Sequence, residues 1–432
     1  MSKRGCRHAL IGTCIAMSAT LLPAAGAWAA TLWVSNSVPV SSPGNSCTHP
    51  GYSTIQAAIT AASNGTSVEV CTGTYAEQLT ITKALKLDAA NGAGTVVVTL
   101  PATPADSITA CDQAPGTEDF QADQDAVSTC TSGTVTISGM TFEAKWPGNT
   151  CYDSLYGVLV AGGATLKATD MTIDGAGAFP IDGCQGGVGI QVGMAWTHPV
   201  ETGHATLSQD TISNYQKNGI TVDGSGSSAK ISHVTVTGAG PTPETAQNGI
   251  QVSNGASAKI ANSHISGNEC DHSSCGPDAF SDYQATGVLF YGAGPGSKLT
   301  NTTLAENDIG AYLYSTQPTQ PIFTEAQING DLFSGDRYEG IALDQGKALI
   351  KHDTIKGPGN IGIDLFQYEG QAYAPNSSAA KDHVEGMSEA AVKVESDKQP
   401  GDHPGSFEMS GSTFSGNAQV LVDESETFSV VL

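Results

Sequence analysis

The chain has 432 residues, of which 51 are glycine and only 14% are charged. Its 42 acidic residues outnumber its 18 basic residues, which gives a formal net charge of −24. Without a basic patch, a nucleic-acid partner is not expected, and a polyanionic substrate would be repelled unless cations such as Ca²⁺ bridge it. The alternative interpretation is that surface carboxylates simply keep the protein soluble.

Residues 1–29 have the organisation of a secretory signal peptide. Lys3, Arg4 and Arg7 form a basic start, an apolar stretch follows, and residues 27–29 (Ala-Trp-Ala) form a cleavage site. The alternative is a membrane anchor, which the Thr, Ser, Gly and Pro content of the stretch disfavours. No later stretch is long and apolar enough to span a bilayer, so we expect a secreted protein with no membrane span.

Eight cysteines follow the predicted signal, and an even number in an exported chain predicts disulfide bonds. The sequence cannot fix the pairing. Pairing between neighbours would close a local loop each time and is the arrangement that we expect. These pairs are Cys47 with Cys71, Cys111 with Cys130, Cys151 with Cys184, and Cys270 with Cys275.

Residues 30–52 are predicted to be an extended lead-in to one domain that spans residues 53–432. That domain begins with a short helix over 53–62, for which Ser53 is the expected N-cap. The apolar residues of this segment fall on one helical face. We expect the helix to cap the open end of a solenoid, where unpaired strand edges would otherwise be exposed.

A repeat runs through most of the chain and is clearest at 218–238 and 248–267. Each copy has a strand that begins Asn-Gly-Ile, a tight turn, a strand that begins Ala-Lys-Ile, and a polar corner that His233 occupies in the first copy. The apolar residues alternate over three to five positions, which indicates short strands and not helices. Such units bury their apolar residues only by stacking, as in a solenoid.

The run STIQAAITAASNGTSVEVCTGTYAEQLTITKALKL at residues 53–87 resembles the start of proteins of the pectate-lyase-like superfamily. The N-G-I-x-V and A-x-I-x-N repeats are similar to that superfamily as well, and the resemblance covers about residues 53–420. It implies an all-β fold, a right-handed parallel β-helix of ten to twelve coils. The superfamily includes lyases, hydrolases, esterases, epimerases and non-catalytic surface proteins, so the resemblance implies no single activity.

Three polar segments interrupt the repeat, near 101–130, 268–285 and 367–405. We interpret them as loop excursions from the solenoid. Long loops on one face of a rigid scaffold often carry function, although they can also be plain insertions.

Residues between the apolar positions of the Gly-led strands should point outward and align from coil to coil. The C-terminal half of this face gathers aromatic and acidic residues. Aromatic rings stack on sugar rings, and carboxylates take hydroxyl groups or Ca²⁺. The expected substrate-binding residues are Tyr291, Tyr312, Tyr314 and Phe366.

Asp344 and Asp364 lie on adjacent predicted coils and are candidates for a catalytic acid/base pair. Arg337 is the third catalytic candidate, because the resemblance to pectate lyases implies an arginine base, but no matching arginine motif surrounds it. Residues 361–367 match the strand motif of alginate epimerases at glycine and aspartate only, and Phe366 stands where that motif has histidine. The alternative is that all these are ordinary surface side chains.

The sequence therefore predicts a secreted, monomeric parallel β-helix protein that binds extracellular polysaccharide. A lyase, hydrolase or epimerase type of reaction on that polysaccharide is the enzymatic hypothesis. The alternative is a non-catalytic protein, either a surface adhesin or a structural scaffold.

Overall fold

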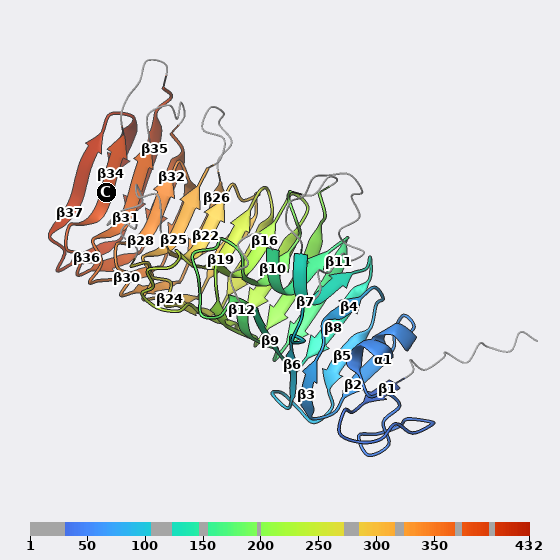
Figure 1. Cartoon of the computed structure of the whole chain (residues 1–432). Coiled ribbons are helices and arrows are strands. Elements are labelled where there is room, and N and C mark those ends of the chain that lie inside the picture. The colour runs from blue at the N-terminus through green and yellow to red at the C-terminus, as the bar shows by residue number, and fades with distance from the viewer. Residues whose placement is uncertain are drawn as a thin grey trace, which may run out of the picture.

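The computed structural model describes residues 31–104, 123–146, 154–196, 200–271, 285–315, 324–367, 374–396 and 402–432. These residues form an elongated stack of coils with three long parallel sheets (Figure 1). Each regular coil contributes one strand to each sheet in turn, and we name the sheets I, II and III in that order. The predicted signal segment lies outside the described residues.

Sheet I contains the Gly-led strands and has twelve members. They are β4 (Leu79–Ile81), β7 (Asp123–Cys130), β10 (Ser154–Ala161), β13 (Val188–Val192), β16 (Asn218–Asp223), β19 (Asn248–Ser253), β22 (Thr286–Tyr291), β25 (Ile309–Tyr314), β28 (Glu339–Asp344), β31 (Ile361–Gln367), β34 (Ala390–Ser396) and β37 (Gln419–Ser425).

Sheet II follows after the tight turn and has fourteen members. They are β1 (Thr31–Val34), β2 (Ser67–Val70), β5 (Lys86–Ala89), β8 (Thr134–Ser138), β11 (Ala164–Thr169), β14 (Gly203–Ser208), β17 (Ser228–Ser232), β20 (Ser257–Ala261), β23 (Ser297–Thr300), β26 (Glu325–Asn329), β29 (Lys347–Lys351), β32 (Asn376–Ala380), β35 (Gly405–Ser410) and β38 (Phe428–Val431).

Sheet III completes each coil and has twelve members. They are β3 (Gly73–Ala76), β6 (Val96–Thr99), β9 (Met140–Trp146), β12 (Thr172–Ala178), β15 (Thr211–Tyr215), β18 (Thr235–Thr237), β21 (His264–Ser266), β24 (Thr303–Ala305), β27 (Leu332–Ser334), β30 (Thr354–Lys356), β33 (His383–Glu385) and β36 (Thr413–Ser415).

The glycine that leads the strands of sheet I from β10 to β31 is required by the close approach of adjacent coils. A Cβ atom on Gly219 would lie 2.6 Å from the carbonyl oxygen of Gly249, well inside van der Waals contact. The neighbouring pair Ile220 and Ile250 stays in register and points into the core. In the Asn-Gly-Ile repeat, the glycine thus marks the close stacking of coils and the isoleucine marks the side chain that points into the core.

The corner between sheets II and III holds one left-handed residue per regular coil. His233, Asn262, Asn301 and His352 have φ between 49° and 58°, a region that polar residues such as Asn enter more readily than most. This is the polar corner that the sequence predicts.

Buried aspartates follow the left-handed residue in several C-terminal coils and bond the backbone of neighbouring coils. Asp353 accepts from the backbone N–H of Asp331 at 2.6 Å and of Lys351 at 3.0 Å, and Asp382 accepts from the N–H of Asp353 at 2.9 Å. Burial raises the pKa of Asp331 to about 7 and the pKa of Asp353 to about 8. These carboxyls hold protons that the same groups would lose in an unfolded chain near neutral pH.

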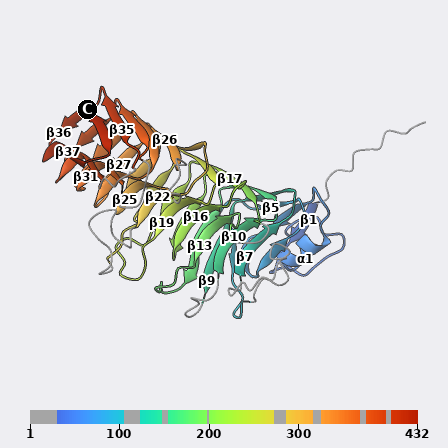
Figure 2. The same cartoon turned by 90° about the horizontal axis from the view of Figure 1, so that it is seen from above.

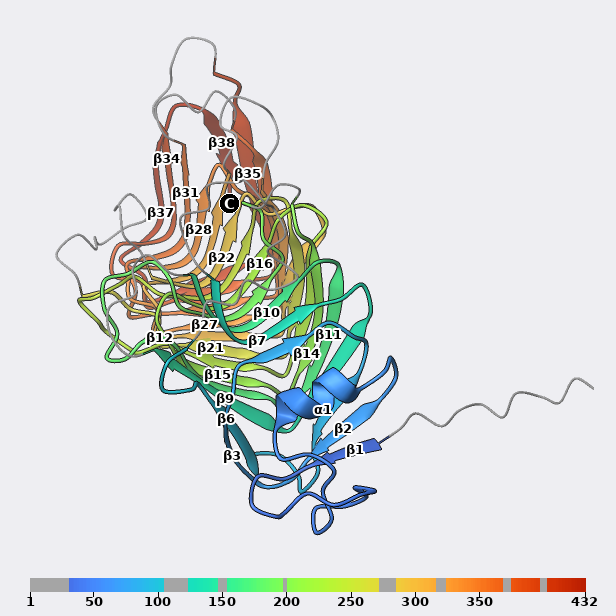
Figure 3. The ribbon, with the colours of Figure 1, turned by 45° about the vertical axis from the view of Figure 1, so that its right-hand side comes forward.

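The predicted N-terminal helix is present as α1 (Ile55–Ala61), beside β1 and β2 (Figure 3). Its N-cap is Thr54 and not Ser53, because the Thr54 side chain accepts the backbone N–H of Ala57 at 3.3 Å. The Glu77 carboxylate accepts the backbone N–H groups of Ile55 and Gln56, each at 2.9 Å. The apolar face of the helix is buried in the main core.

The structure corrects the predicted boundaries of the lead-in and the excursions. The lead-in already contains β1, which pairs with β2, and the segment 101–130 ends in β7 of sheet I. The predicted excursion at 367–405 is wrong for its centre, where β32, β33 and β34 form a regular coil. Its strands use small and charged residues, which hid the alternation. Residues 272–284 of the middle excursion lie outside the described residues.

The predicted disulfide between Cys47 and Cys71 is present, with an S–S distance of 2.07 Å. Cys130, Cys184 and Cys270 are disulfide-bonded as well. The partners predicted for these three, Cys111, Cys151 and Cys275, lie outside the described residues. In the described part of the chain, no helix has the length and apolar character needed to cross a membrane.

Candidate functional site

The strand register of sheet I brings the predicted site residues together on the outer face. In Figure 2, β22 and β25 lie side by side in the row of sheet I strands. One column across the strands contains Leu289, Tyr312, Ala342 and Asp364, and the next contains Tyr291, Tyr314, Asp344 and Phe366. Parallel strands in one register align their side chains, so the sequence could place these columns.

The aromatic residues of these columns form one packed group. The rings of Tyr291 and Tyr314 are stacked, with centroids 5.1 Å apart and an interplanar angle of 7°. Tyr312 meets Tyr314 edge to face at 6.2 Å and lies 6.4 Å from Phe366. Tyr312 and Phe366 belong to an apolar cluster that is separate from the main core, which confirms that they face away from the inside of the solenoid.

The outer face is open at one end and covered at the other, which the sequence did not predict. Tyr291 is 41% exposed, whereas Tyr312 is 8% exposed and Phe366 is fully buried. A ligand in solution therefore meets the stacked tyrosines first. The carboxyl groups beyond them lie in a desolvated environment.

Asp364 is the most unusual carboxyl group on this face. It is fully buried, and among the described residues neither of its carboxylate oxygens has a hydrogen-bond partner. Burial raises its pKa well above the ordinary value, and the nearby charges of Glu339 and Glu395 raise it further, while Lys393 opposes them. These effects favour the protonated form of the Asp364 carboxyl.

Asp344 lies on the preceding strand and contacts the aromatic group. It is 1% exposed, and the Tyr312 hydroxyl donates a hydrogen bond to its Oδ2 atom at 3.5 Å. Burial and the charge of Asp344 raise the pKa of Tyr314. The register sets Asp344 diagonally to Asp364, because Asp344 pairs with Phe366. With strands about 4.8 Å apart and a rise of about 3.3 Å per residue, their Cα atoms are separated by about 8 Å.

Glu339 is a buried acid near Asp364 that sequence reasoning missed. It is the first residue of β28 and pairs with Ile309 and Ile361, the first residues of the two neighbouring strands, and it is fully buried. The lead glycine interrupts the alternation of the strand, so that the residue before it also faces outward. The signal is visible in an earlier coil, where the Asn218 side chain donates to Thr221 Oγ1 at 3.0 Å.

Arg337 is held at a corner next to the start of β28. Its guanidinium forms ion pairs with Asp308 at 2.6 Å and Asp271 at 3.1 Å and donates to the carbonyl oxygen of Cys270. It also lies over the ring of Tyr338, 4.9 Å from the centroid. These contacts tie segment 268–271 to the solenoid.

The acids of this face do not form a metal site of the usual kind. Among the described residues, no group of three or more His, Cys, Asp or Glu side chains is arranged to hold a metal ion. Lys393, on the next strand, instead pairs with Glu389 at 3.1 Å and Glu395 at 2.5 Å.

Comparison with known proteins agrees with this architecture. The sequence model of the family described as "Right handed beta helix region" matches residues 156–379. No curated protein sequence matches the chain.

Solved structures that resemble the chain share little sequence with it. A mutant catalytic domain of a GH87 α-1,3-glucanase in complex with nigerose superposes with a TM-score of 0.56 at 13% identity, over 91% of this chain and 67% of the glucanase chain. The catalytic unit of the GH87 α-1,3-glucanase of Streptomyces thermodiastaticus gives 0.53 at 12% identity, over 88% and 64%. A mutant of the periplasmic alginate epimerase AlgG gives 0.50 at 9%, over 84% and 77%. At these identities the likeness shows the fold alone.

Proposed function

This chain belongs to the family of right-handed β-helix proteins, and we propose that it binds extracellular polysaccharide on the outer face of sheet I and processes it with Asp364 and Asp344. The observation that carries this proposal is the Asp364 carboxyl, which is buried with both oxygens unpartnered beside an aromatic group. A group of this kind costs folding free energy, and such costs concentrate at functional sites.

The stacked tyrosines supply the binding part of the proposed site. Tyr291, which is 41% exposed and whose ring is stacked on that of Tyr314, supplies the exposed aromatic surface at the open end of the face. Sugar rings carry apolar C–H faces that pack on such surfaces, while their hydroxyl groups bond to nearby acids. The polysaccharides processed by the structurally similar glucanase and epimerase make a glycan the natural ligand to test first.

Asp364 is suited to act as the general acid. A carboxyl that keeps its proton at neutral pH can donate it to a glycosidic oxygen as the bond breaks. Asp344, about 8 Å away at Cα, would then act as the base, and a separation of this order leaves room for a substrate or a water between the two groups. The same pair could serve proton abstraction in a lyase or an epimerase.

We assign Arg337 a positioning role in this proposal. Its guanidinium is already shared between two carboxylates and a carbonyl oxygen. An arginine in that state is a poor proton acceptor. It would hold segment 268–271 at the edge of the face.

The remaining features of the proposal concern the setting of the protein. We propose that residues 1–29 direct secretion, that the mature protein is a monomer, and that α1 caps the N-terminal end of the solenoid. The buried apolar face of α1 and its contacts with β1, β2 and β4 support the last point.

A non-catalytic glycan-binding protein is the second candidate. The observation that favours it is the complete burial of Asp364, because a catalytic acid must reach its substrate. In that case the tyrosines alone would carry function, and Asp364 would be a buried acid without a reaction.

A glycan panel with single substitutions separates these candidates. Purified protein is incubated with alginate, polygalacturonate, α-glucans and β-glucans, with and without Ca²⁺, and reducing ends and unsaturated products are measured. We expect product from at least one glycan and a loss of at least 100-fold in rate for Asp364→Asn. Glu424→Gln is the matched control, since Glu424 lies exposed on the same face, one strand beyond Glu395. No product from any glycan, or full activity of Asp364→Asn, would refute the catalytic proposal.

A further inference from the structure

A column of lysines crosses the outer face of sheet II, on a different side of each coil from the proposed site. The register places Lys230, Lys259 and Lys298 on three successive strands. Continuing toward the N-terminus, the same column contains Thr206, Lys167, Thr136 and Lys86. Five of seven successive positions are therefore lysine, over a length of about 29 Å at about 4.8 Å per strand.

The lysine column has no acids beside it from β8 to β23, whereas β5, which carries Lys86, also contains Asp88. Strands β8, β11, β14, β17, β20 and β23 contain no Asp, no Glu and no aromatic residue. Most of the flanking outward positions carry hydroxyl or imidazole groups, and Ala261 beside Lys259 is an exception. His204 and Ser228, for example, are hydrogen-bonded to each other at 2.9 Å. The surface around Thr206, Lys230 and Lys259 is hollowed into a shallow groove.

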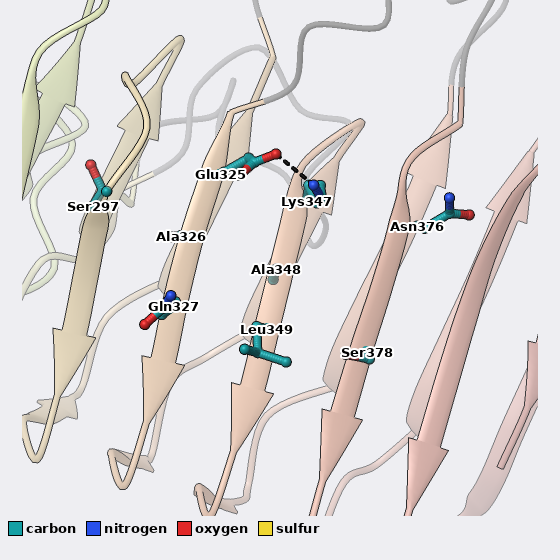
Figure 4. Close-up of a pocket in the computed structure, with 10 residues that line it drawn as sticks. Ser297, Glu325, Ala326, Gln327, Lys347, Ala348, Leu349, Asn376 and Ser378 are labelled. Atoms are coloured by element: carbon teal, nitrogen blue, oxygen red, sulfur yellow. Dashed lines mark hydrogen bonds and ion pairs between the residues drawn. The ribbon is translucent and has the colours of Figure 1, made fainter.

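The column is unexpected in a chain with 42 acidic and 18 basic residues. Like charges on directly opposed positions of neighbouring strands repel and destabilise a sheet. Elsewhere in the same sheet a lysine faces an acid: Lys347 forms an ion pair at 2.6 Å with Glu325 on the adjacent strand (Figure 4). Repulsion along the lysine column is thus retained where acidic partners would have been easy to place.

The column also ends sharply. The next three positions toward the C-terminus are Gln327, Leu349 and Ser378 (Figure 4), and Leu349 is 37% exposed. Because charges more than about 8–10 Å away are largely screened at physiological salt, the acids elsewhere on the molecule do not cancel the column. A local positive stripe remains on an acidic protein.

We propose that the lysine column binds an acidic polysaccharide lengthwise, with the chain of the polysaccharide running along the axis of the solenoid. The lysines repeat at the strand spacing, so they match a polymer whose carboxylates repeat along its length. The hydroxyl groups on both sides are suited to sugar hydroxyls. Nucleic acid fits less well, because bases need aromatic or arginine partners for stacking, and these strands have none. The choice of a polysaccharide rests on the proposed function.

This surface would hold a polymer while sheet I acts on it, or would anchor the protein to an acidic matrix. The net negative charge of the chain predicts that a polyanion is repelled, but on this side of the solenoid the lysines would attract it. Bridging by Ca²⁺ is not required for binding to lysine.

The test uses affinity electrophoresis in gels that contain polygalacturonate, alginate or neutral dextran, with EDTA present so that cations cannot bridge acids. One triple variant replaces the three consecutive lysines of the column, and a second makes the same charge change on the C-terminal coils, away from the column. The column variant is Lys230→Gln, Lys259→Gln and Lys298→Gln, and the control variant is Lys347→Gln, Lys351→Gln and Lys381→Gln.

We expect the polyuronates to retard the wild type, the column variant to bind at least tenfold more weakly, and the control to stay within twofold of wild type. Raising NaCl from 50 to 500 mM should abolish the retardation, and dextran should have no effect. Equal losses in both triple variants, equal retardation by dextran, or tighter binding of single-stranded DNA than of polyuronate would overturn the proposal. Catalysis is read from product formation in the glycan panel and binding to this surface from retardation in EDTA, so that failure of either gives a different result. Circular dichroism confirms that each variant is folded.

Discussion

Two buried aspartates on the outer face of sheet I show how differently its halves are built. Asp223, in the N-terminal half, accepts hydrogen bonds from Ser253, Asn254 and the backbone N–H of Ala195, at 2.7, 2.8 and 2.7 Å. Asp364, in the C-terminal half, is equally buried and accepts none from the part of the chain that the structure describes. The first is part of the scaffold, whereas the second lowers stability and needs another reason to be there.

The other buried carboxyls with raised pKa values also lie mostly in the C-terminal half. Burial raises the pKa of Asp331 to about 7 and the pKa values of Asp336 and Asp353 to about 8. Asp210 is the counterpart in the N-terminal half, with a pKa of about 7. The C-terminal coils thus concentrate the groups that titrate near neutral pH.

The largest expected effect is a loss of stability of the C-terminal coils as the pH rises. The folded state holds these protons more tightly than the unfolded chain, so the stabilisation is complete below about pH 4 and is lost as the pH rises through 7 and 8. We expect the free energy of unfolding to fall by several kcal/mol between pH 5 and pH 9.

Hydrogen exchange at the two pH values, corrected for the intrinsic rate, locates this loss. Amides of β27–β33 should lose protection at pH 9, while amides of β16–β21 change little, because coils of a solenoid open semi-independently. Uniform loss along the chain, or none, would show that the two halves do not differ in this way.

The next effect compares the two aspartates directly. Asp223→Ala should destabilise the protein by about 3 kcal/mol, because three donors, one of them the buried Ser253 hydroxyl, lose their acceptor. Asp364→Ala should be neutral or stabilising, since it removes a buried polar group without partners. Urea unfolding of both variants at pH 7 measures the difference. Equal destabilisation would mean that Asp364 makes contacts comparable to those of Asp223.

A smaller effect concerns the stacked tyrosines at the open end of the outer face of sheet I. Tyr314→Ala should weaken glycan binding about tenfold, because a stacking contact is worth about 1 kcal/mol or slightly more. Phe179→Ala is the control, since Phe179 is 62% exposed and lies in the N-terminal half, after β12. Calorimetric titration with an oligosaccharide found in the panel gives both affinities. A similar loss in the two variants would remove the tyrosines from the site.

The fold and the columns of the site follow from the sequence because a parallel solenoid converts spacing into position. Once Gly-led strands are recognised, Tyr314, Asp344 and Phe366 must align, and they do. Glu339 was not predicted because the lead glycine interrupts the alternation, which a simple in–out pattern does not include. Asn218 holds the same position in an earlier coil, and its contact with Thr221 shows that the residue before the lead glycine faces outward.

Other features could not be predicted because they depend on contacts between distant residues. The burial of Phe366 and the ion pairs of Arg337 with Asp271 and Asp308 arise from packing across coils and corners. The regular coil at β32–β34 was hidden by its small and charged residues. The lysine column was present in the sequence, but its meaning required the strand register.

The protonation state of Asp364 tests the central claim most directly. Infrared difference spectra of wild type against Asp364→Asn at pH 7 detect the C=O stretch of a protonated carboxyl. We predict such a band in the wild type, which is absent in the variant and persists to higher pH than for an ordinary aspartate. An ionised Asp364 at pH 7, with no such band, would contradict the account of this residue as an acid held ready for proton transfer.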